Sequence, residues 1–372
     1  MAFSSGLEAA AAVVHSLAGA GHRAYLVGGC VRDLLMGHAA KDFDVATDAR
    51  PDAVLALFGR AFGVGAHFGV VLVPLRVDGQ EIVTEVATFR SDGAYSDGRR
   101  PDEVEYTRDP KHDVLRRDFT INGMLLDVDR YLASGDAASA VLDYVGGRED
   151  LGAGVMRAIG PPMRRFTEDK LRMLRAVRFA ARFGFTIDRE TFASIRVLAH
   201  EIGLVSRERT RDELTRMLTE GRAAEAFKML EATGLLRQVL PEVAAMRGVA
   251  QPPEWHPEGD VWVHTLLLLE KLAPSCSSTL AWGALLHDVG KPPTYTVRDR
   301  IRFNGHAEVG TRMAAAICRR LRFSNEETEQ ILALVANHMR FGDVGKMTES
   351  TLKRFFRLPK FPEHLELHRL DV

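Results

Sequence analysis

The sequence lacks the features that would assign it to a membrane or secreted class of protein. No run of 18 apolar residues occurs among its 372 residues, so neither a transmembrane helix nor a membrane partner is expected. Its three cysteines, Cys30, Cys276 and Cys318, are too few and too far apart for a disulfide framework or a metal-binding pair. The N-terminus carries Glu8 and has no basic start, so it does not predict a signal peptide. We therefore expect a cytoplasmic protein.

An excess of positive charge is also absent, because 49 Lys and Arg residues are balanced by 50 Asp and Glu residues. A uniformly basic coat for nucleic acid is thus excluded, and DNA is not an expected partner. Basic charge is concentrated only between Arg157 and Arg182, where eight basic and two acidic residues occur. The chain is 46% hydrophobic, which is enough for a substantial core in two or three domains.

The predicted elements change along the chain from mixed to helical. Four short runs rich in apolar and β-branched residues predict strands in the first half, at residues 24–27, 43–46, 70–75 and 82–87. Residues 92–110 are polar and predict a long loop, and the pattern is helical from Phe166 onward. A proline-containing segment at residues 251–253 predicts a linker. We therefore predict a head over residues 1–150, a neck and body over 151–250, and a further domain over 251–372. The chain stops directly after a helical stretch, which is typical of a fragment truncated at its C-terminus.

A glycine pair in the head has the character of a phosphate-binding turn. Gly28 and Gly29 stand between a predicted strand and a predicted helix, where missing side chains let backbone amides approach a ligand. Arg32 follows one turn later and could clamp phosphate oxygens. An ordinary strand-to-helix turn has the same sequence signature, so the pair alone is weak evidence.

A pair of aspartates follows this turn. Asp42 and Asp44 are two residues apart, so on a strand both carboxylates face the same side. Two hard oxygen ligands suit Mg²⁺, which can activate a hydroxyl and hold a triphosphate. Glu85 on a later strand is a candidate third carboxylate. The alternatives are a solvated strand end for the pair and a surface position for Glu85.

Two arginine-rich segments add further phosphate-binding groups. Arg116 and Arg117 stand at the start of a helix that we predict over residues 116–122. A later helix would carry four polar residues along one side, namely Asp169, Arg172, Arg175 and Arg178. Its opposite side would carry Leu174, Val177 and Ala181. An aspartate and an arginine one turn apart can offer an acceptor and a donor to a base edge. Taken alone, each segment could instead be a solvated helix surface.

Seven pieces of the sequence, taken in order, resemble the class II tRNA nucleotidyltransferase and bacterial poly(A) polymerase family. They are LVGGCVRD, KDFDVAT, ATFRSDGAYSDGRRP, LRRDFTINGM, LDYVGGREDL, FTEDKLRMLRAVRFAARFGF and RERTRDEL, and they span residues 20–245. The resemblance implies an α/β head, a mixed sheet with helices, followed by an all-α neck, body and C-terminal domain. It also implies Mg²⁺-dependent, template-independent addition of nucleotides to the 3′ end of tRNA, with ATP and CTP as the nucleotide partners.

The same resemblance implies a role for each matching residue. Catalysis would involve Asp42, Asp44, Arg117 and Asp118, and the two aspartates before Arg117 would hold the metal ions. Nucleotide binding would involve Gly28, Gly29, Arg32, Arg116, Arg117, Asp169, Arg172, Arg175 and Arg178, with Asp169 and Arg172 pairing with the base. The neck helix would be braced by Glu208, Arg209 and Arg211, and the family's mobile loop would correspond to residues 90–100.

Histidines and aspartates recur in the last third of the chain. The order is His264, His287-Asp288, His306, His338 and Asp371, with Lys291 after the His-Asp pair and His264 on a predicted amphipathic helix over 261–272. Imidazoles and carboxylates are natural ligands of borderline divalent ions. This order resembles the HD phosphohydrolase superfamily. The resemblance implies one transition ion, such as Ni²⁺, Mn²⁺ or Co²⁺, on His264, His287, Asp288 and Asp371, and a second supported by His306 and His338.

We therefore expect an enzyme that adds CMP and AMP to tRNA and carries a fused HD phosphohydrolase. Addition of A only, of CC only, or of a poly(A) tail uses the same pocket residues and stays open. A phosphohydrolase with a non-catalytic RNA-binding half, or a non-catalytic RNA chaperone, is disfavoured by the joint presence of Asp42, Asp44, Arg117, Asp169 and Arg172. The oligomeric state and the substrate of the HD domain do not follow from the sequence.

Overall fold

The computed structural model describes residues 4–64, 69–93, 104–254 and 259–372. The chain divides into two compact units. The first contains residues 1–169 and 186–191, and the second contains 170–185 and 192–372. The division of the chain at residues 150 and 250 stays a prediction. None of the described helices has both the length and the apolar character that crossing a membrane requires.

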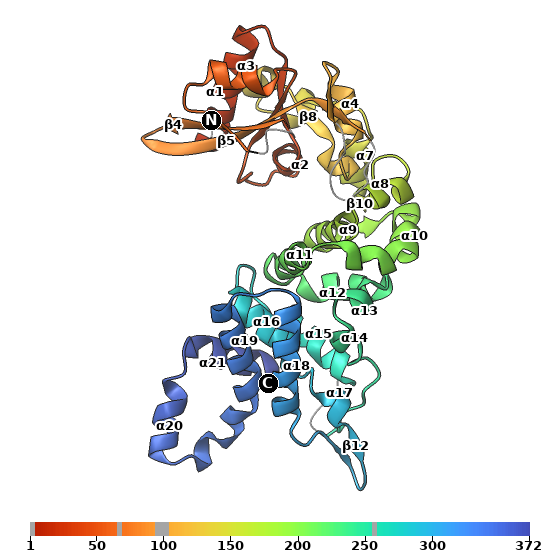
Figure 1. Cartoon of the computed structure of the whole chain (residues 1–372), viewed down its shortest axis with the longest axis vertical. Coiled ribbons are helices and arrows are strands. Elements are labelled where there is room, and N and C mark those ends of the chain that lie inside the picture. Colours follow the sequence, from red (N-terminus) through yellow and green to blue (C-terminus); the bar gives the residue numbers. More distant parts are fainter. Residues whose placement is uncertain (1–3, 65–68, 94–103, 255–258) are drawn as a thin grey trace. The chain divides into compact units, whose positions relative to one another are not determined.

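The first unit is built on a mixed seven-stranded sheet in the order β3-β4-β5-β2-β1-β8-β9 (Figure 1). Its strands are β1 (Ala24–Val27), β2 (Asp44–Thr47), β3 (Phe62–Gly63), β4 (Val70–Val77), β5 (Gln80–Thr88), β8 (Met124–Leu126) and β9 (Val141–Asp143). Strands β2 and β5 run parallel, and each other pair of neighbours within the described sheet is antiparallel.

The remaining elements of this unit cover or extend the sheet. The helices are α1 (Ser5–Gly19), α2 (Gly29–Leu35), α3 (Pro51–Leu57), α4 (Pro110–Leu115), α5 (Val128–Ser134), α6 (Ala137–Ala140), α7 (Gly147–Ala153), α8 (Pro162–Glu168) and the 3₁₀ turn η2 (Thr120–Asn122). Two small strand pairs are β6 (Arg90–Asp92) with β7 (Val104–Tyr106), and β10 (Val155–Met156) with β11 (Thr186–Ile187). In the main core, Leu7, Val13 and Leu17 of α1 pack with Leu26 and Val45 of the sheet, which removes apolar surface from water.

The four strands predicted in the first half all form, with small shifts at their ends. Strand β2 begins at Asp44 and not at Phe43, so Asp42 lies before the strand. The predicted loop over 92–110 is wrong at both its ends, because Asp92 closes β6 and residues 104–106 pair with it as β7. The expected mobile loop over 90–100 lies outside the described residues from position 94 onward.

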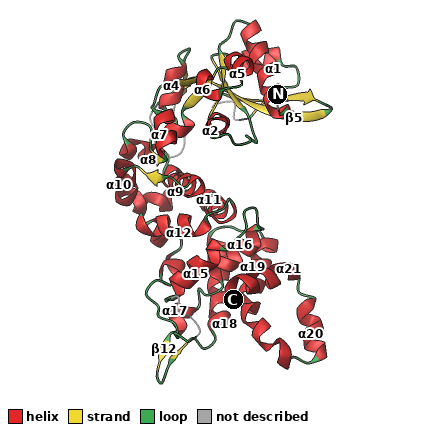
Figure 2. Ribbon diagram, turned by 180° about the vertical axis from the view of Figure 1, so that it is seen from behind, coloured by secondary structure: helices red, strands yellow, loops and turns green. Residues whose placement is uncertain are grey.

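The second unit is almost entirely helical, with one short hairpin formed by β12 (Thr296–Val297) and β13 (Ile301–Arg302) (Figure 2). The neck and body comprise α9 (Leu171–Phe183), α10 (Arg189–Leu198), η3 (Ala199–Leu204), α11 (Arg207–Thr219), α12 (Ala223–Ala232), α13 (Leu235–Val239) and α14 (Pro241–Ala244). The rest comprises α15 (Val261–Glu270), α16 (Ser278–Leu286), α17 (Lys291–Thr294), α18 (His306–Arg320), α19 (Asn325–Asn337), η4 (His338–Lys346), α20 (Glu349–Phe356) and α21 (Phe361–Asp371).

Helix α11 explains why the neck and the C-terminal helices form one compact unit. On one side, its Glu213 accepts a hydrogen bond of 2.6 Å from the buried Arg178 of α9. On another side, its Thr215 accepts one of 2.9 Å from the indole Nε1 of Trp282, a fully buried residue of α16. One helix thus packs against both the neck and the helix that leads to the His-Asp pair.

Candidate functional site

The predicted carboxylates of the head lie where strands β1, β2 and β5 meet. Val27, the last residue of β1, is opposite Asp44 in the antiparallel pair, so the glycine turn begins beside Asp44. Val45 is opposite Val86 in the parallel pair, which places Asp44 and Glu85 at equivalent positions on the same face. The sequence suggested Glu85 only as a candidate, and the strand register supports it.

The electrostatics of Asp44 fit a cation site. Burial, together with the charges of Glu85 and Asp42, raises the pKa of Asp44 to about 6, against the opposing effect of Arg117. A carboxylate destabilised in this way gains from a bound cation, which removes the repulsion that raises its pKa. Asp44, whose pKa is raised in part by the charges of Glu85 and Asp42, is therefore suited to a position beside a divalent cation.

The guanidinium groups of Arg32 and Arg117 lie against the glycine turn. Gly28 has φ +80°, a left-handed conformation that side-chain-bearing residues rarely adopt. A Cβ atom built at Gly28 would lie 3.7 Å from Nη1 of Arg117, and one at Gly29 would lie 3.4 Å from Nη2 of Arg32. Both arginines thus lie within ordinary contact distance of the turn, and the backbone conformation at Gly28 is what favours glycine there.

Arg32 differs from expectation, because its side chain is buried behind the turn. It donates to Oδ1 of Asn122 at 2.6 Å and to Oδ1 of Asp33 at 2.7 and 2.9 Å. Arg32 as a whole is only 4% exposed. In this structure Arg32 braces the turn against η2, and it is not presented to a phosphate.

The helix predicted to start at Arg116 is wrong. Helix α4 begins at Pro110, is capped by the side chain of Asp109, and ends at Leu115 with Arg116 as its C-cap. Phe119 then pairs in extended conformation with Ala158. The proline starts the helix because its missing N–H costs nothing in the first turn, so Arg116 and Arg117 come at the end of the helix. Asp118, which the resemblance places among the catalytic residues, accepts a hydrogen bond from the backbone N–H of Phe119 at 2.8 Å.

Both arginines are held by Asp113, a residue that the sequence analysis missed. Asp113 accepts from Arg116 at 2.6 and 2.9 Å and from Arg117 at 3.0 and 3.2 Å. Burial alone would raise the pKa of this carboxyl, but the guanidiniums of Arg117 and Arg116 hold it below its usual value. The signal was present, because Asp113 precedes the arginines by three and four residues, the spacing of helical ion pairs.

The predicted face of Asp169, Arg172, Arg175 and Arg178 is not a single helix face. Helix α8 ends at Glu168, Asp169 is extended with φ −143° and ψ 106°, and α9 begins at Leu171. Asp169 therefore lies outside α9, whereas Arg172 and Arg175 are half-buried on it. The opposite side is buried as predicted, at Leu174, Val177 and Ala181.

Arg178 also departs from its predicted role at the nucleotide. Its side chain is 4% exposed, is bound to Glu213 at 2.6 Å and Glu220 at 3.2 Å, and stacks on Phe179. The expected bracing of the neck by Glu208, Arg209 and Arg211 stays a prediction, and the structure shows that Glu208 and Arg211 both contact Arg322. Glu213 of α11 and Glu220 at its end hold Arg178 of α9.

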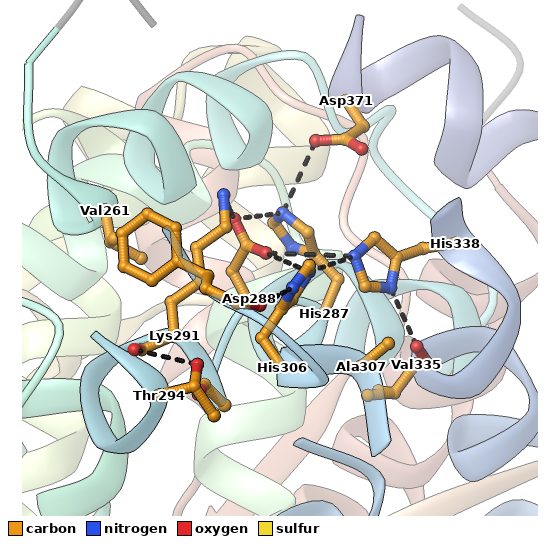
Figure 3. A network of polar contacts seen from close by, with 12 residues as sticks. Val261, His287, Asp288, Lys291, Thr294, His306, Ala307, Val335, His338 and Asp371 are labelled. Carbon is orange, nitrogen blue, oxygen red and sulfur yellow. Dashed lines mark hydrogen bonds and ion pairs between the residues drawn. The ribbon is translucent and has the colours of Figure 1, made fainter. Parts of the chain in front are cut away.

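The histidines and aspartates of the C-terminal segment converge on one centre (Figure 3). They come from α15 (His264), the end of α16 (His287, Asp288), the start of α18 (His306), the start of η4 (His338) and the end of α21 (Asp371). Their ligand atoms form two triads, and within each triad all three atoms lie within 4.8 Å of one another. The first triad is His264, His287 and Asp371, and the second is Asp288, His306 and His338. Helix α15 is less amphipathic than predicted, since apolar Val263 and Leu267 lie on its exposed side.

Asp288 lies between the two triads. Its Oδ2 is 3.2 Å from Nε2 of His287, and its Oδ1 is 3.6 Å from Nε2 of His306 and 3.8 Å from Nε2 of His338. Asp371 Oδ1 lies 2.9 Å from Nε2 of His264. A single carboxylate thus faces both groups and is placed to be shared by two ions.

The orientation of three imidazoles is set by backbone carbonyls. Nδ1 of His287, His306 and His338 lies 2.8, 2.9 and 2.7 Å from the carbonyl oxygen three residues earlier. A proton on Nδ1 leaves the lone pair on Nε2, the form that binds a metal. Nε2 of His287 is buried and has no hydrogen-bond partner in the described structure, which fits a metal ligand.

The charges of this centre also fit a cation. Burial opposes protonation of His287, but Asp288 and Asp371 raise its pKa to about 10. Burial and the charge of His287 lower the pKa of His338 to about 4. Lys291 contributes a further cation, since its Nζ lies 2.7 Å from Asp288 and donates to Gln251 at 2.6 Å. Gln251 is 3% exposed, so the predicted linker is part of the folded centre at this residue.

Asp371 is well supported although it is the penultimate residue. Nζ of Lys271 donates to the carbonyl oxygens of Leu370 at 3.0 Å and of Val372 at 3.2 Å. Earlier on α21, Glu363 accepts from Thr279 of α16 at 2.8 Å and from Gln330 of α19 at 3.0 Å. These contacts fix α21 and thereby the position of its terminal carboxylate.

Three family models match the chain in the order of its parts. A poly A polymerase head domain matches residues 24–157, a probable RNA and SrmB-binding site of polymerase A matches 184–247, and an HD domain matches 261–367. The fold and the two centres thus define a nucleotidyltransferase head joined to an HD domain, and both kinds of domain imply dependence on divalent metal ions.

Proteins of similar sequence and structure identify the family within this class. The multifunctional CCA protein of Nitrosospira multiformis is 35% identical over 333 residues, which cover 88% of this chain and 75% of that protein. The CCA-adding enzyme of Bacillus subtilis is 41% identical over 228 residues, which cover 61% of this chain and 54% of that protein. A crystal structure of the Bacillus stearothermophilus CCA-adding enzyme with CTP has a TM-score of 0.68 at 26% identity, covering 99% of this chain and 82% of that chain.

The chain belongs to the CCA-adding enzyme and poly(A) polymerase family and carries an HD domain. The family resemblance and the fold class predicted from the sequence are thereby confirmed. The chain spans between 54% and 59% of the length of several CCA-adding enzymes that it matches, from Bacillus pumilus, Lactiplantibacillus plantarum and Geobacillus thermodenitrificans.

Proposed function

We propose that this protein adds CMP and AMP, without a template, to the 3′ end of tRNA in the bacterial cytoplasm. The observation that carries this proposal is the geometry of the head. The glycine turn, Asp44, Glu85 and Arg117 come together where the central strands β1, β2 and β5 meet. The 35% identity to the multifunctional CCA protein of Nitrosospira multiformis supports addition of CCA, and the likeness to the Bacillus stearothermophilus CCA-adding enzyme, solved with CTP, supports CTP as a nucleotide.

Different residues of the head would bind the metal, the phosphates and the base. Asp42 and Asp44 would hold Mg²⁺, and when bound this ion would assist attack by the RNA hydroxyl and neutralise the triphosphate. The backbone amides at Gly28 and Gly29 would face the phosphates, and Arg117, which lies beside Gly28, would oppose their charge. Asp169 and Arg172 offer an acceptor and a donor for a base edge, which would select the nucleotide without a template.

The decisive experiment incubates the purified protein with each NTP and with tRNAs that lack one, two or all three of the terminal CCA nucleotides. A product that stops after CCA supports the proposal. A product that stops at CC, an enzyme that acts only on tRNA already ending in CC, or a growing A tail would identify the corresponding relative of this activity. Absence of all addition with Mg²⁺ would refute a nucleotidyltransferase function.

A second activity is favoured by the HD centre, where Asp288 faces both triads. We propose that His264, His287, Asp288 and Asp371 hold one transition ion, and that His306 and His338 support a second, for hydrolysis of phosphate esters. Imidazole-rich sites favour Ni²⁺, Mn²⁺ or Co²⁺ over Mg²⁺. The test is hydrolysis of a nucleoside 2′,3′-cyclic phosphate and of a simple phosphomonoester with each ion. No turnover with any of these ions would refute this activity.

A further inference from the structure

The head contains a buried carboxylate that the proposed reaction does not use. Asp113 is completely excluded from solvent, and it lies on α4 rather than at the glycine turn. A buried charge of this kind is strongly unfavourable unless it is paired. Its partners are the two arginines to which the family resemblance assigns nucleotide contact.

The way in which Asp113 holds the arginines is specific. Its Oδ1 accepts from Nε and Nη2 of Arg116, and its Oδ2 accepts from Nε and Nη2 of Arg117. Each guanidinium is therefore bound along one edge, which fixes the plane of the group. The edge of Arg117 that carries Nη1 remains directed away from Asp113, and Nη1 is the atom that approaches Gly28.

The charge of Asp113 is as important as its geometry. Arg116 and Arg117 are adjacent cations, and one ionised carboxylate between them offsets their repulsion. The guanidiniums of Arg117 and Arg116 hold the pKa of Asp113 below its usual value, so the carboxylate is ionised at neutral pH. An uncharged residue of the same shape could accept only at one oxygen and would leave the two cations together.

We propose that Asp113 is a positioning residue, which aims Arg117 at the triphosphate beside the glycine turn and Asp44. The inference rests on the proposed nucleotidyl transfer. A long arginine side chain loses considerable conformational freedom on being fixed. When that loss occurs during folding, the contact with phosphate costs less at the moment of binding.

A merely structural role for Asp113 makes a different prediction. Asp113 also accepts weakly from the backbone N–H of Arg90 at 3.4 Å, so it helps to hold β6. Loss of such support would lower the stability and the active fraction, but it would leave the KM for CTP of the folded enzyme unchanged. KM measured on folded protein therefore separates the two roles.

The test compares Asp113→Asn and Asp113→Glu with Asp48→Asn in the full chain. Asp48 is a matched control, since its mostly buried carboxylate accepts from Arg23 N at 2.9 Å beyond the opposite end of β2. For Asp113→Asn we expect the KM for CTP to rise by about tenfold, or ~1.4 kcal/mol, with the KM for tRNA within about twofold. Asp48→Asn should change neither, and Asp113→Glu should recover part of the loss.

A double-mutant cycle with Arg117→Ala completes the experiment. If Asp113 acts through Arg117, Asp113→Asn should have little further effect on CTP binding once Arg117 is truncated. A wild-type KM in folded Asp113→Asn, or effects of the two substitutions that multiply, would overturn the inference. Equilibrium CTP binding gives the same comparison if the wild-type chain adds no nucleotide, a result that would reject the proposed reaction and not the positioning role.

Discussion

The head site and the HD centre are built in different ways, although carboxylates are central to both. In the HD centre, the three ligand atoms of each triad already lie within 4.8 Å of one another. Among the described residues of the head, no three carboxylates or imidazoles converge to that extent. The head instead has one half-buried carboxylate with a raised pKa, and arginines held by a separate buried acid.

The difference follows from what each site must bind. Imidazoles that are anchored through Nδ1 can be fixed by the fold itself, so the HD centre is preorganised for metal. A triphosphate brings its own charge and oxygen ligands, so the head needs cationic groups with a fixed direction and carboxylates that a metal can draw together. We therefore expect the two centres to respond differently to substitution and to metal.

The largest effect is expected from Asp44→Ala. This change removes a carboxylate that would hold Mg²⁺, and nucleotide addition should fall by at least about a thousandfold, or ~4 kcal/mol. tRNA binding and any hydrolysis at the HD centre should stay within about twofold. Turnover measured with CTP and a tRNA lacking its 3′ end checks this. Retention of more than about a tenth of the wild-type rate would contradict the metal assignment.

Substitutions in the HD centre should affect hydrolysis and not nucleotide addition. His287→Ala with Asp288→Ala removes ligands from both triads and should abolish hydrolysis while leaving nucleotide addition within about twofold. After chelation, Mg²⁺ alone should restore addition, and a transition ion should be needed for hydrolysis.

His306→Ala is a second HD variant that should disturb the fold less, because the His306 side chain is 12% exposed and its removal leaves a smaller buried cavity. Loss of addition in both HD variants would show that α11, which packs on α9 and α16, couples the centres. That result would contradict their independence.

A smaller effect is expected on the choice of nucleotide. Asp169→Ala or Arg172→Ala should weaken the preference for CTP and ATP over UTP and GTP by about tenfold to a hundredfold. A site built to pair with a base edge discriminates because a wrong base leaves polar groups unsatisfied. Incorporation of all four NTPs by each variant is the measurement, with Arg189→Ala, an exposed arginine of α10, as a control. An unchanged preference would mean that other side chains read the base.

The smallest effect concerns the attachment of the HD helices to the body. Glu242 of α14 binds Arg320 of α18 at 2.8 Å. Burial would raise the pKa of Glu242, but the hydrogen bond and charge of Arg320 hold it below the ordinary value of 4.5. The pair therefore stabilises the fold above that pH, and its contribution disappears as the pH falls through the lower pKa of the folded state.

Because both groups are partly exposed, Glu242→Gln should reduce the free energy of unfolding at pH 7 by no more than about 1 kcal/mol. Denaturation of the wild type and the variant at pH 7 and near pH 3 checks this. A difference that persists undiminished at the lower pH would show that the ion pair is not its source.

Some parts of this protein could be read from residue types and spacing alone. The strands at 24–27, 70–77 and 80–88 follow from apolar and β-branched runs, because such runs stabilise a strand wherever one face is buried. The order His264, His287-Asp288, His306, His338 and Asp371 identified the side chains that the fold brings together, because few other arrangements satisfy so many imidazoles and carboxylates.

Other parts were decided by tertiary structure. Arg178 lies on the same helix as Arg172 and Arg175, yet a glutamate on another helix buries it. Asp169 is itself in extended conformation between two helices and so lies outside α9, and the side chain of Arg32 is held behind its turn by Asn122. Helical periodicity reports which residues share a face, but not which face meets solvent or an opposite charge.

Residue types and their spacing were thus enough to define the chemistry available to each region: a glycine turn with paired aspartates in the head, and an ordered set of metal-binding side chains at the C-terminus. The packed fold was needed to show which of the charged groups are held by partners within the protein. That pairing depends on partners distant in sequence, as when Asn122 holds Arg32, or on burial, as when Asp113 loses all contact with water and must bind two arginines. Burial makes an unpaired charge costly, so the packed fold, rather than local spacing, determines where each arginine points.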